Sequence, residues 1–542
     1  MTDPIDRRGL LAGAAASASL GLGLAASPSF AGPRDDTGVH ASIGARTTAG
    51  RIRGFRDRDV AVFKGVPYGD DTARTRFAAP KPPRPWRGVR PCLDFGAPAP
   101  QPGGNPGAGY LPDSTYTQDQ TSEDCLNLNL WTPALDGARR PVLVWFHGGG
   151  FSGWSANSPL YDGANLAKWG DAVVVTVNHR LNAFGYLYLG QLGGERFADS
   201  GNAGMLDLVL ALQWIRDNIE GFGGDPGRVT LFGQSGGGAK ASVLMAMPAA
   251  RGLFHRVMTM SGQQVTVTPA EMATTAARKF LTNAAVDTPD ALLTMSKDQL
   301  IAATRGVSTG PVLDGRSLTR DPFEPDATPL ARDVALIMGN THDETRYLIG
   351  LDEPDLSALT WDQLVPALKR SIPNFFGPLT PESAVVWYRD KHPGYSPSQI
   401  FFAMTTELRS WRAQIIQADR RAVQPGANTW VYQFDWQSPV LDGRMGAPHC
   451  GDIPFMFRNH REMVSMTGGG PETDAVADAM SSALINFART GDPNGAGVPA
   501  WPKYELPGRV TMQWNTVSKA TPDPRGEERR LVGLIPYRQP GT

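Results

Sequence analysis

The hydrophobic and polar positions along the chain predict alternating buried strands and helices. Residues 141–146 and 172–177 are nearly continuous apolar runs, typical of strands buried on both faces of a parallel sheet. Residues 60–63 and 126–131 alternate in the manner of half-buried strands, which predicts strands with one exposed face. Residues 205–219 cluster their apolar side chains on one broad face at helical spacing, so this segment is predicted to be a helix.

A serine stands where one of these apolar runs meets a helix. The run at 228–232 leads into Gly-Gln-Ser-Gly-Gly at 233–237, and good helix formers follow until Pro248. This is the Gly-x-Ser-x-Gly nucleophile elbow, a sharp turn in which glycines leave room for close backbone approach. A helix that begins just after Ser235 would favour negative charge developing there. The order strand, helix, strand, elbow, helix predicts a doubly wound α/β fold with Ser235 as nucleophile.

A second copy of the motif, at 306–310, has a different context. Its Ser308 follows a segment that resembles a helix end, and Pro311 prevents a helix of useful length from starting after it. Short motifs produce such false matches, so Ser308 is not expected to be a nucleophile.

The rest of the chain fits one large α/β domain, predicted over 32–542. Residues 266–300 and 355–425 read as helices with Pro-rich breaks, and we expect them to cover the end of the sheet where ligands bind. The Pro/Gly-rich segment 97–111 is predicted to be a surface loop. The expected architecture is a large, mostly parallel central sheet flanked by helices, with a helical cap.

Composition and charge exclude several functional classes. The chain has 542 residues, 41% of them hydrophobic and 19% charged, with a net charge of -1 and no basic runs. Nothing in it favours nucleic acid or an anionic membrane surface as a partner. Three cysteines are too few for a disulfide scaffold, although one bridge between Cys92 and Cys125 is conceivable in an oxidising compartment. Their spacing matches no metal site, so neither a metal nor a cofactor is expected.

The first 31 residues resemble a twin-arginine export signal. Arg7 and Arg8 precede an Ala/Gly/Ser/Leu run at 10–26, and a small-x-small cleavage site ends at Ala31, although Asp6 stands where Ser or Thr is more usual. The alternative is a membrane anchor, but the run is short and rich in Gly and Ser for a bilayer core of about 30 Å. We therefore expect cleavage after residue 31, no stable membrane insertion, and a periplasmic or secreted protein.

Three further segments join Ser235 and carry a resemblance to a known family. They are Phe-His-Gly-Gly-Gly-Phe at 146–151, Asp-Glu-Thr at 343–345 after an apolar run, and Gly-Ala-Pro-His-Cys-Gly-Asp at 446–452. With matching motifs at 63–68, 122–129 and 487–494, residues from about 45 to 515 resemble a bacterial type-B carboxylesterase. This is the cholinesterase-like branch of the α/β-hydrolases. The resemblance implies an α/β-hydrolase fold and a serine hydrolase that cleaves small-molecule carboxylic esters through an acyl-enzyme.

The resemblance also implies the catalytic residues. The expected order of nucleophile, acid and base matches Ser235, Glu344 and His449, with Asp343 as the alternative acid. A serine needs an adjacent base, and a carboxylate behind the imidazole fixes its tautomer and stabilises the imidazolium. Position and flanking sequence favour His449 over the other histidines. Those are His40, His147, His179, His255, His342, His392 and His460. The oxyanion is expected to bind the backbone N–H groups of Gly149, Gly150 and Gly236.

Two residues beside the serine depart from the family pattern. Gln234 stands where Glu is usual, which removes a buried negative charge and lowers the expectation of choline-like substrates. Gly236 stands where Ala is usual but still supplies its amide.

The first family cysteine is displaced, with Ala99 near its usual place and Cys92 upstream, so the usual bridge to Cys125 is in doubt.

Three further residues have open assignments. Ser261 is either a hydrogen-bond partner of the triad acid, by resemblance, or a solvated serine at a strand end. Phe151 and Trp154 are either walls of the acyl pocket or ordinary core residues.

Two other functions are compatible with the motifs. Amide or carbamate cleavage uses the same triad chemistry, with a leaving group that departs less readily. A non-catalytic, cholinesterase-like recognition protein is the rival from another class. Such relatives typically lose members of the triad, whereas this chain keeps all three and the glycine run.

Overall fold

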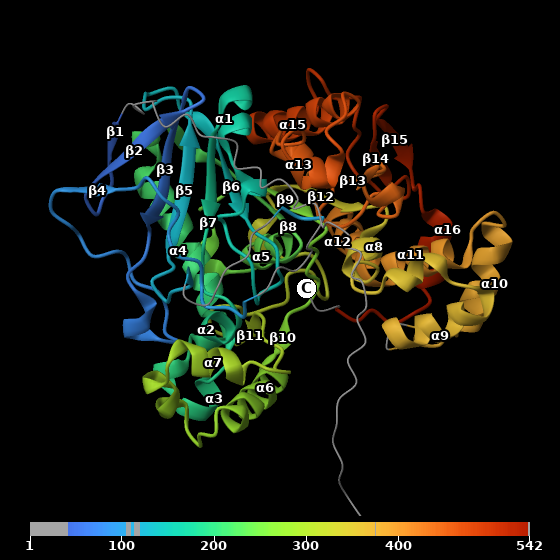
Figure 1. Ribbon diagram of the computed structural model, residues 1–542, viewed down its shortest axis with the longest axis horizontal. Helices are drawn as coiled ribbons and strands as arrows, with labels where there is room; N and C mark the ends of the chain where they lie inside the picture. The colour runs from blue at the N-terminus through green and yellow to red at the C-terminus, as the bar shows by residue number, and fades with distance from the viewer. Residues whose placement is uncertain (1–41, 104–109, 113–119, 374–375, 540–542) are drawn as a thin grey trace, which may run out of the picture. The chain divides into compact units, whose positions relative to one another are not determined.

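The computed structural model describes residues 42–103, 110–112, 120–373 and 376–539. Within these residues the chain forms one large sheet of 13 strands and a second sheet of two strands (Figure 1). In spatial order the large sheet consists of β1 (Ile43–Arg46), β2 (Arg51–Asp57), β3 (Val60–Pro67), β5 (Asn127–Thr132), β7 (Val173–Val177), β6 (Arg140–Phe146), β8 (Gly224–Gln234), β9 (Arg256–Met260), β12 (Ala335–Thr341), β13 (Thr429–Phe434), β14 (Val510–Trp514) and β15 (Lys519–Pro522), with β4 (Val89–Pro91) on β2. The small sheet pairs β10 (Thr268–Pro269) with β11 (Val312–Leu313).

The centre of the large sheet is parallel and its margins are antiparallel. Strands β7, β6, β8, β9, β12, β13 and β14 pair in parallel. The pairs β1–β2, β2–β3, β3–β5, β5–β7 and β14–β15 are antiparallel, and the short β4 pairs with β2 in parallel. Each parallel connection must cross over the sheet, so helices cover both faces. This confirms the mostly parallel sheet that the apolar runs at 141–146 and 172–177 predicted.

The two faces of the large sheet carry two main hydrophobic cores, and some of the helices form smaller clusters of their own. The helices are α1 (Ala164–Gly170), α2 (Asn182–Tyr186), α3 (Gly190–Gly193), α4 (Ala203–Asn218), α5 (Gly236–Leu244), α6 (Ala270–Asn283), α7 (Lys297–Ala303), α8 (Glu344–Leu348), α9 (Trp361–Ser371), α10 (Pro381–Lys391), α11 (Pro397–Thr406), α12 (Arg412–Ala422), α13 (Ile453–Met456), α14 (Val464–Thr467), α15 (Thr473–Thr490) and α16 (Gly526–Val532). Along β6, Val142 and Val144 pack into a core with α4, while Leu143 and Trp145 pack into a core with α15. Successive strand residues point to opposite faces, so a strand covered on both sides is apolar throughout.

Two groups of helices follow strands of the parallel region. Helices α6 and α7 come after β9, and α9 to α12 come after β12; Figure 1 shows α6–α7 and α9–α11 as two separate groups beside the sheet. They correspond to the helical segments predicted at 266–300 and 355–425. Helix α11 contacts α8, and thereby joins the second group to the site described below.

Three of the predictions for individual segments are wrong. Residues 60–63, at the start of β3, are all buried, so this part of the strand has no exposed face. Strand β5 has no exposed face: all six of its residues are buried, because it lies between β3 and β7 in the covered part of the sheet. Its polar Asn129 is satisfied internally by a bond of 3.0 Å from Nδ2 to Thr176 Oγ1. The described part of the predicted surface loop 97–111 is largely buried, with Gln101 only 6% exposed.

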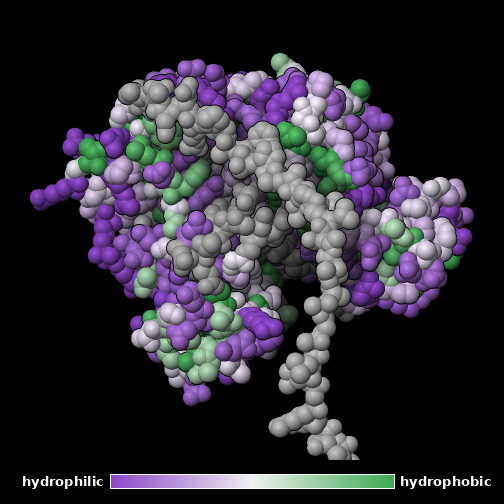
Figure 2. All heavy atoms as spheres, in the orientation of Figure 1, coloured by the Kyte–Doolittle hydropathy of each residue, from purple (hydrophilic) through white to green (hydrophobic). Residues whose placement is uncertain are grey.

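The remaining features concern the ends and the surface of the chain. Ala41–Thr542 form one compact unit, while the predicted export signal at 1–31 lies outside the described residues. Among the helices described, none is both long and apolar enough to cross a membrane. On the face shown in Figure 2, hydrophilic residues dominate the described surface and apolar residues form small, separate groups.

Candidate active site

The predicted nucleophile lies at a strained turn between β8 and α5. Ser235 has φ 56° and ψ -127°, a costly conformation for a residue with a side chain, and its N–H donates to Met260 O at 2.8 Å. It is the one partly exposed residue in an otherwise buried stretch from 231 to 240. A Cβ on Gly233 would lie 2.5 Å from the carbonyl carbon of Gly237, and a Cβ on Gly237 would overlap the carbonyl oxygen of Phe146. The glycines therefore permit the turn, as the motif predicted.

The second copy of the motif has none of these features. Ser308 is exposed in an irregular segment after α7, and no helix follows it. The prediction that Ser308 is not a nucleophile agrees with this placement.

Glu344 and His449 form a buried pair. Glu344 is the first residue of α8, directly after the end of β12, and His449 lies in the loop before α13. The two side chains are 0% and 3% exposed, and Glu344 Oε2 contacts His449 Nδ1 in a short hydrogen bond. The other carboxylate oxygen accepts the N–H of Thr341 at 2.8 Å. Because Nδ1 faces a carboxylate, it carries a proton, and Nε2 of the neutral ring is left as the basic nitrogen.

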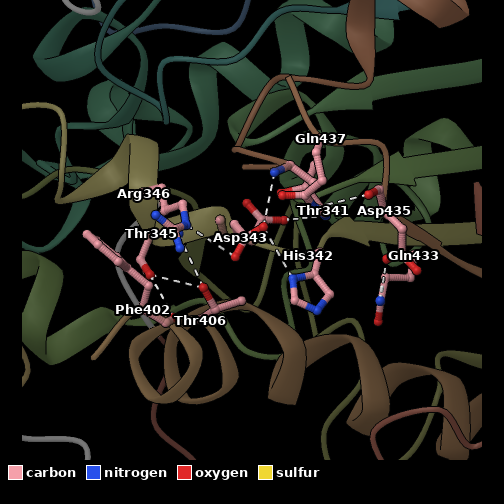
Figure 3. A network of polar contacts seen from close by, with 12 residues as sticks. Thr341, His342, Asp343, Thr345, Arg346, Phe402, Thr406, Gln433, Asp435 and Gln437 are labelled. Atoms are coloured by element: carbon pink, nitrogen blue, oxygen red, sulfur yellow. Dashed lines mark hydrogen bonds and ion pairs between the residues drawn. The ribbon is translucent and has the colours of Figure 1, made fainter. Parts of the chain in front are cut away.

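The neighbouring carboxylate of Asp343 has other partners (Figure 3). It lies 3.2 Å from His342 Nδ1, accepts Arg346 Nε at 3.3 Å and accepts the N–H of Ala447 at 3.0 Å. Burial alone would raise the pKa of Asp343, but the bond and charge of His342 and the charge of Arg346 hold it below its usual range. Asp343 thus anchors the loop that carries His449, and the geometry favours Glu344 over Asp343 as the acid.

Residues of α11 hold the other side of Glu344. The hydroxyl of Thr345 lies 2.7 Å from Thr405 Oγ1 and 3.0 Å from Thr406 Oγ1, and it donates to Phe402 O at 3.1 Å (Figure 3). These bonds fix the start of α8, and with it the backbone of Glu344, against the second helical group.

Gln234 contacts the imidazole of His449 directly. Its Nε2 lies 3.1 Å from His449 Nε2, and its Oε1 accepts the thiol of Cys450 at 3.3 Å. A neutral imidazole with its proton on Nδ1 accepts at Nε2, so the amide is the donor in this contact. Among the described residues, no hydrogen bond joins Ser235 Oγ to His449. The sequence marked Gln234 as a departure from the family pattern, but it gave no sign of Cys450 as its partner.

The glycine run that follows β6 has its peptide groups oriented by identifiable bonds. Gly149 and Gly150 have φ 79° and 60°, which side-chain-bearing residues rarely adopt. His147 Nδ1 lies 2.9 Å from Gly148 O, and Gly149 O accepts the N–H groups of Ser152 and Gly153 at 3.2 and 3.1 Å. In a planar trans peptide the C=O and N–H groups point in opposite directions. Because these two carbonyls are fixed, the N–H groups of Gly149 and Gly150 point away from the groups that donate to the carbonyls.

The third predicted donor lies against the same run. A Cβ on Gly236 would overlap the carbonyl oxygen of Gly150, and a Cβ on Gly148 would lie 3.3 Å from Ser235 Cβ. The start of α5 and the glycine run thus meet backbone to backbone beside the serine. The first N–H groups of a helix have no partner within it, so Gly236 has a donor to offer there.

Ser261 does not play the part that the resemblance implied. Its backbone N–H donates to Gly339 O at 2.7 Å, but its hydroxyl is buried and bonds neither Glu344 nor any other described residue. It is not a solvated serine either. Ser261 has a φ of 50°, and a Cβ on the next residue, Gly262, would overlap the carbonyl oxygen of Ser235. Both features adapt this strand end to the close approach of the elbow.

Phe151 and Trp154 are mostly core residues. Phe151 is 4% exposed and packs edge-on against Tyr186 with ring centroids 5.2 Å apart. Trp154 is 8% exposed, and Gln101 clamps its backbone, accepting its N–H at 2.7 Å and donating to its carbonyl at 2.9 Å. Sequence reasoning missed Gln101, because its partner is 53 residues away. It also missed Tyr347, whose ring stacks on His449 at 6.0 Å.

The three cysteines are free thiols. Cys92, Cys125 and Cys450 are all buried, so the bridge between Cys92 and Cys125 does not form. Burial raises the pKa of Cys92 to about 11 and that of Cys125 well above its usual range. Within the described segments, no cluster of His, Cys, Asp and Glu has the geometry to hold a metal ion.

Comparisons with known proteins identify the family of this chain. The model of the carboxylesterase family matches residues 41–529. The chain is 34% identical to the para-nitrobenzyl esterase of Bacillus subtilis (strain 168), over 90% of this chain and 97% of that one. It is 36% identical to the phenmedipham hydrolase of Pseudarthrobacter oxydans, over 85% and 92%. The solved structure of a Geobacillus stearothermophilus carboxylesterase superposes with a TM-score of 0.79 at 38% identity, over 90% and 99%. The chain therefore belongs to the carboxylesterase family, with the α/β-hydrolase fold and the carboxylic ester hydrolase activity of a serine esterase.

Proposed function

We propose that the chain hydrolyses neutral carboxylic esters through an acyl-enzyme on Ser235, with His449 as the base and Glu344 as its orienting acid. The observation that carries this proposal is the buried contact between Glu344 and His449 Nδ1, beside the only partly exposed residue of the elbow. The pair gives a serine hydrolase its base in the correct tautomer.

In the proposed first half-reaction, Ser235 Oγ attacks the ester carbonyl carbon as its proton passes to His449 Nε2. The carbonyl oxygen becomes an oxyanion, which accepts the N–H groups of Gly149, Gly150 and Gly236. Collapse of this intermediate breaks the bond to the alcohol oxygen, which leaves with the proton from His449. In the resting structure Nε2 is bonded to Gln234 instead, so Ser235 replaces this amide in the reacting complex.

The second half-reaction repeats these steps with water. Water loses a proton to His449 Nε2 and attacks the acyl carbon, and the new oxyanion binds the same three N–H groups. Collapse returns the proton to Ser235 Oγ and releases the carboxylic acid.

The charge of the site favours uncharged substrates. Gln234 is neutral and fully buried where a carboxylate would attract cations, and it is held by Cys450 and His449. We therefore expect kcat/KM for a choline ester to be no higher than for its neutral 3,3-dimethylbutyl isostere. The names of two relatives supply further substrates to test, para-nitrobenzyl esters and phenmedipham.

A fluorophosphonate probe followed by peptide mass spectrometry tests the nucleophile. The expected result is a single adduct on the peptide that contains Ser235, with loss of p-nitrophenyl acetate hydrolysis in proportion to labelling. Labelling of another serine, or full activity after complete labelling, would refute the assignment.

Amide or carbamate cleavage is the second candidate function, and the relative named phenmedipham hydrolase is the observation that favours testing it. A matched pair of p-nitrophenyl acetate and p-nitroacetanilide separates the activities, because the two differ in the leaving atom. We expect kcat/KM for the ester to be higher by several orders of magnitude, since amines leave less readily than alkoxides.

We also propose that the protein is exported and that residues 1–31 are removed. The paired arginines, the short apolar run and the small-x-small site support this proposal. Amino-terminal sequencing of protein recovered outside the cytoplasm of the native host would give a start at residue 32. Retention of Arg7 and Arg8 in that protein would contradict it.

A further inference from the structure

A lysine is buried directly behind the glycine run. Lys240 lies one turn into α5, is 0% exposed, and donates from Nζ to His147 O at 3.0 Å. The same Nζ lies 5.7 Å from the ring centre of Phe151. Since His147 and Phe151 flank the glycines at 148–150, both ends of the run contact one amino group.

This amino group has no anionic partner among the described residues. The titratable groups that face it are the imidazoles of His147, from the loop after β6, and His179, after the end of β7. Both rings are fully buried and lie 4.8 Å apart. Burial is expensive for a lysine, and a carboxylate normally compensates for it, so Lys240 cannot be explained as half of an ion pair.

The bond to His147 completes the pattern found for the glycine run. The carbonyl of His147 belongs to the peptide whose N–H is that of Gly148, just as the fixed carbonyls of Gly148 and Gly149 belong to the peptides of Gly149 and Gly150. Three consecutive peptide planes are thus held, each by different donors. Glycine lacks a side chain to restrict it, so its peptides need such external bonds to keep one orientation.

Lys240 also connects this run to the nucleophile. Residues 236, 237 and 240 lie on one side of α5, since positions four apart in a helix are neighbours. Gly236 and Gly237 meet the run through backbone contacts. Lys240 adds a side-chain hydrogen bond from α5 to His147, the residue directly before the run. A bond of this kind fixes orientation, which close packing of glycines does not.

We propose that Lys240 is a positioning residue for ester hydrolysis: it fixes the oxyanion-binding glycine run against the nucleophile helix and places an amino group behind the developing oxyanion. The proposal deepens the proposed function and rests on the oxyanion hole described there. When protonated, the amino group adds a positive charge on the side from which the N–H groups point at the oxyanion, where low polarity strengthens the interaction.

The Lys240→Met variant tests this role, because methionine has similar length and no hydrogen-bond donor. With p-nitrophenyl acetate we expect kcat to fall about 10- to 100-fold and KM to change less than about threefold, since positioning acts in the transition state. The affinity for a trifluoromethyl ketone, which forms a tetrahedral oxyanion on the serine, should fall in parallel. The affinity for the corresponding secondary alcohol, which forms none, should stay the same.

Two further variants separate positioning from structural support. Ser242→Ala removes a buried hydroxyl without a partner from the same helix and should leave kcat unchanged. If Lys240→Met does not fold, kcat and ketone affinity are measured on Lys240→Gln, which removes the charge and keeps a hydrogen-bond donor. Thermal unfolding should show that the variants are folded at the assay temperature.

The outcomes distinguish this inference from the proposed function. If the parent enzyme labels on Ser235 and the lysine variants keep full kcat and ketone affinity, Lys240 has no such role. A loss of activity that tracks only the fraction of unfolded protein, with equal losses of ketone and alcohol affinity, overturns it as well. If the parent itself does not label on Ser235, the proposed function fails, and this inference fails with it.

Discussion

The side-chain amide of Gln234 lies 3.1 Å from Nε2 of His449, on the ring nitrogen opposite the one that Glu344 contacts. The thiol of Cys450 fixes which end of the amide faces the ring, because it donates to Oε1. The amide therefore occupies the ring nitrogen that must accept the proton of the serine in the proposed reaction. The residue that departs from the family pattern contacts the proposed base at its reacting atom.

The variant Gln234→Glu tests this relationship. A carboxylate beside Nε2 favours the protonated imidazolium, so the base becomes inactive at a higher pH than in the parent. We expect the acid limb of the profile of kcat/KM against pH to move upward by roughly one unit or more. The measurement uses a neutral ester, whose own charge does not change with pH. An unmoved limb would show that Gln234 does not influence the base.

The two serine motifs provide a matched pair of variants. Ser235→Ala removes the nucleophile and should lower kcat by roughly 10⁴- to 10⁶-fold, leaving only the effects of binding and the oxyanion hole. Ser308→Ala changes an exposed serine in the same sequence pattern and should leave kcat unaltered. Steady-state kinetics on the two purified variants measure both. Near-normal turnover by the first would refute the assignment.

Most of the site could be predicted because the predicted nucleophile, acid and oxyanion-binding glycines each lie in a short motif soon after a strand, whereas His449 lies in the loop before α13. Ser235 follows β8, Glu344 follows β12, and the glycine run follows β6, so local sequence shows both the residue and its setting. Parallel strands end at the same edge of a sheet, which brings such motifs together. The apolar runs of β6 and β7 indicated the parallel region because a strand covered on both faces is apolar throughout.

The contacts that refine the site could not be read in this way. Gln101 clamps Trp154 across 53 residues, and the partners of Gln234 lie 215 and 216 residues away. The prediction of an exposed face for β5 was wrong because it rested on the polar residues Asn127 and Asn129. Both are buried, and each bonds a partner inside the protein. For Lys240 a signal existed, since it is the single charged residue in the helix that follows the elbow.

Two adjacent carboxylates allow the acid to be identified by substitution. Glu344→Gln removes the charge that orients His449 and should lower kcat by about 10³- to 10⁴-fold, because the imidazole loses its preferred tautomer. Asp343→Asn keeps an acceptor for the N–H of Ala447, so we expect a loss of no more than about tenfold together with lower thermal stability. Kinetics and thermal unfolding of both variants give the comparison. A larger kinetic loss in Asp343→Asn would reverse the assignment.

Gly236→Ala restores the residue that the family usually has, yet it should impair this enzyme. The added Cβ would overlap the carbonyl oxygen of Gly150, and backbone atoms on both sides leave no flexible group to yield. The glycine run must then shift, and misplaced oxyanion donors lower kcat by roughly 10- to 100-fold. Gly137→Ala is the control, since a Cβ there meets nothing within 4 Å. Unchanged kcat in Gly236→Ala would show that the run can move without loss.

The free energy of unfolding should depend on pH because Lys240 is buried. Burial lowers the pKa of Lys240 from 10.5 to about 7. Between these values the unfolded chain holds a proton that the folded chain releases, so this group makes stability rise with pH, by up to about 1.4 kcal/mol per unit. Below the folded pKa both states are protonated and the full cost of the buried charge is present. Above the unfolded pKa both are neutral and the cost vanishes.

Comparing Lys240→Met with the parent isolates this contribution, because the other titrating groups are common to both proteins. The free energy of unfolding of the variant minus that of the parent should be largest at about pH 7 or below, and it should shrink steadily toward about pH 10. Urea denaturation at a series of pH values measures the difference. A difference that does not vary with pH would mean that Lys240 titrates alike in the folded and unfolded chains, and its amino group would then not be the desolvated group that the structure places behind the glycine run.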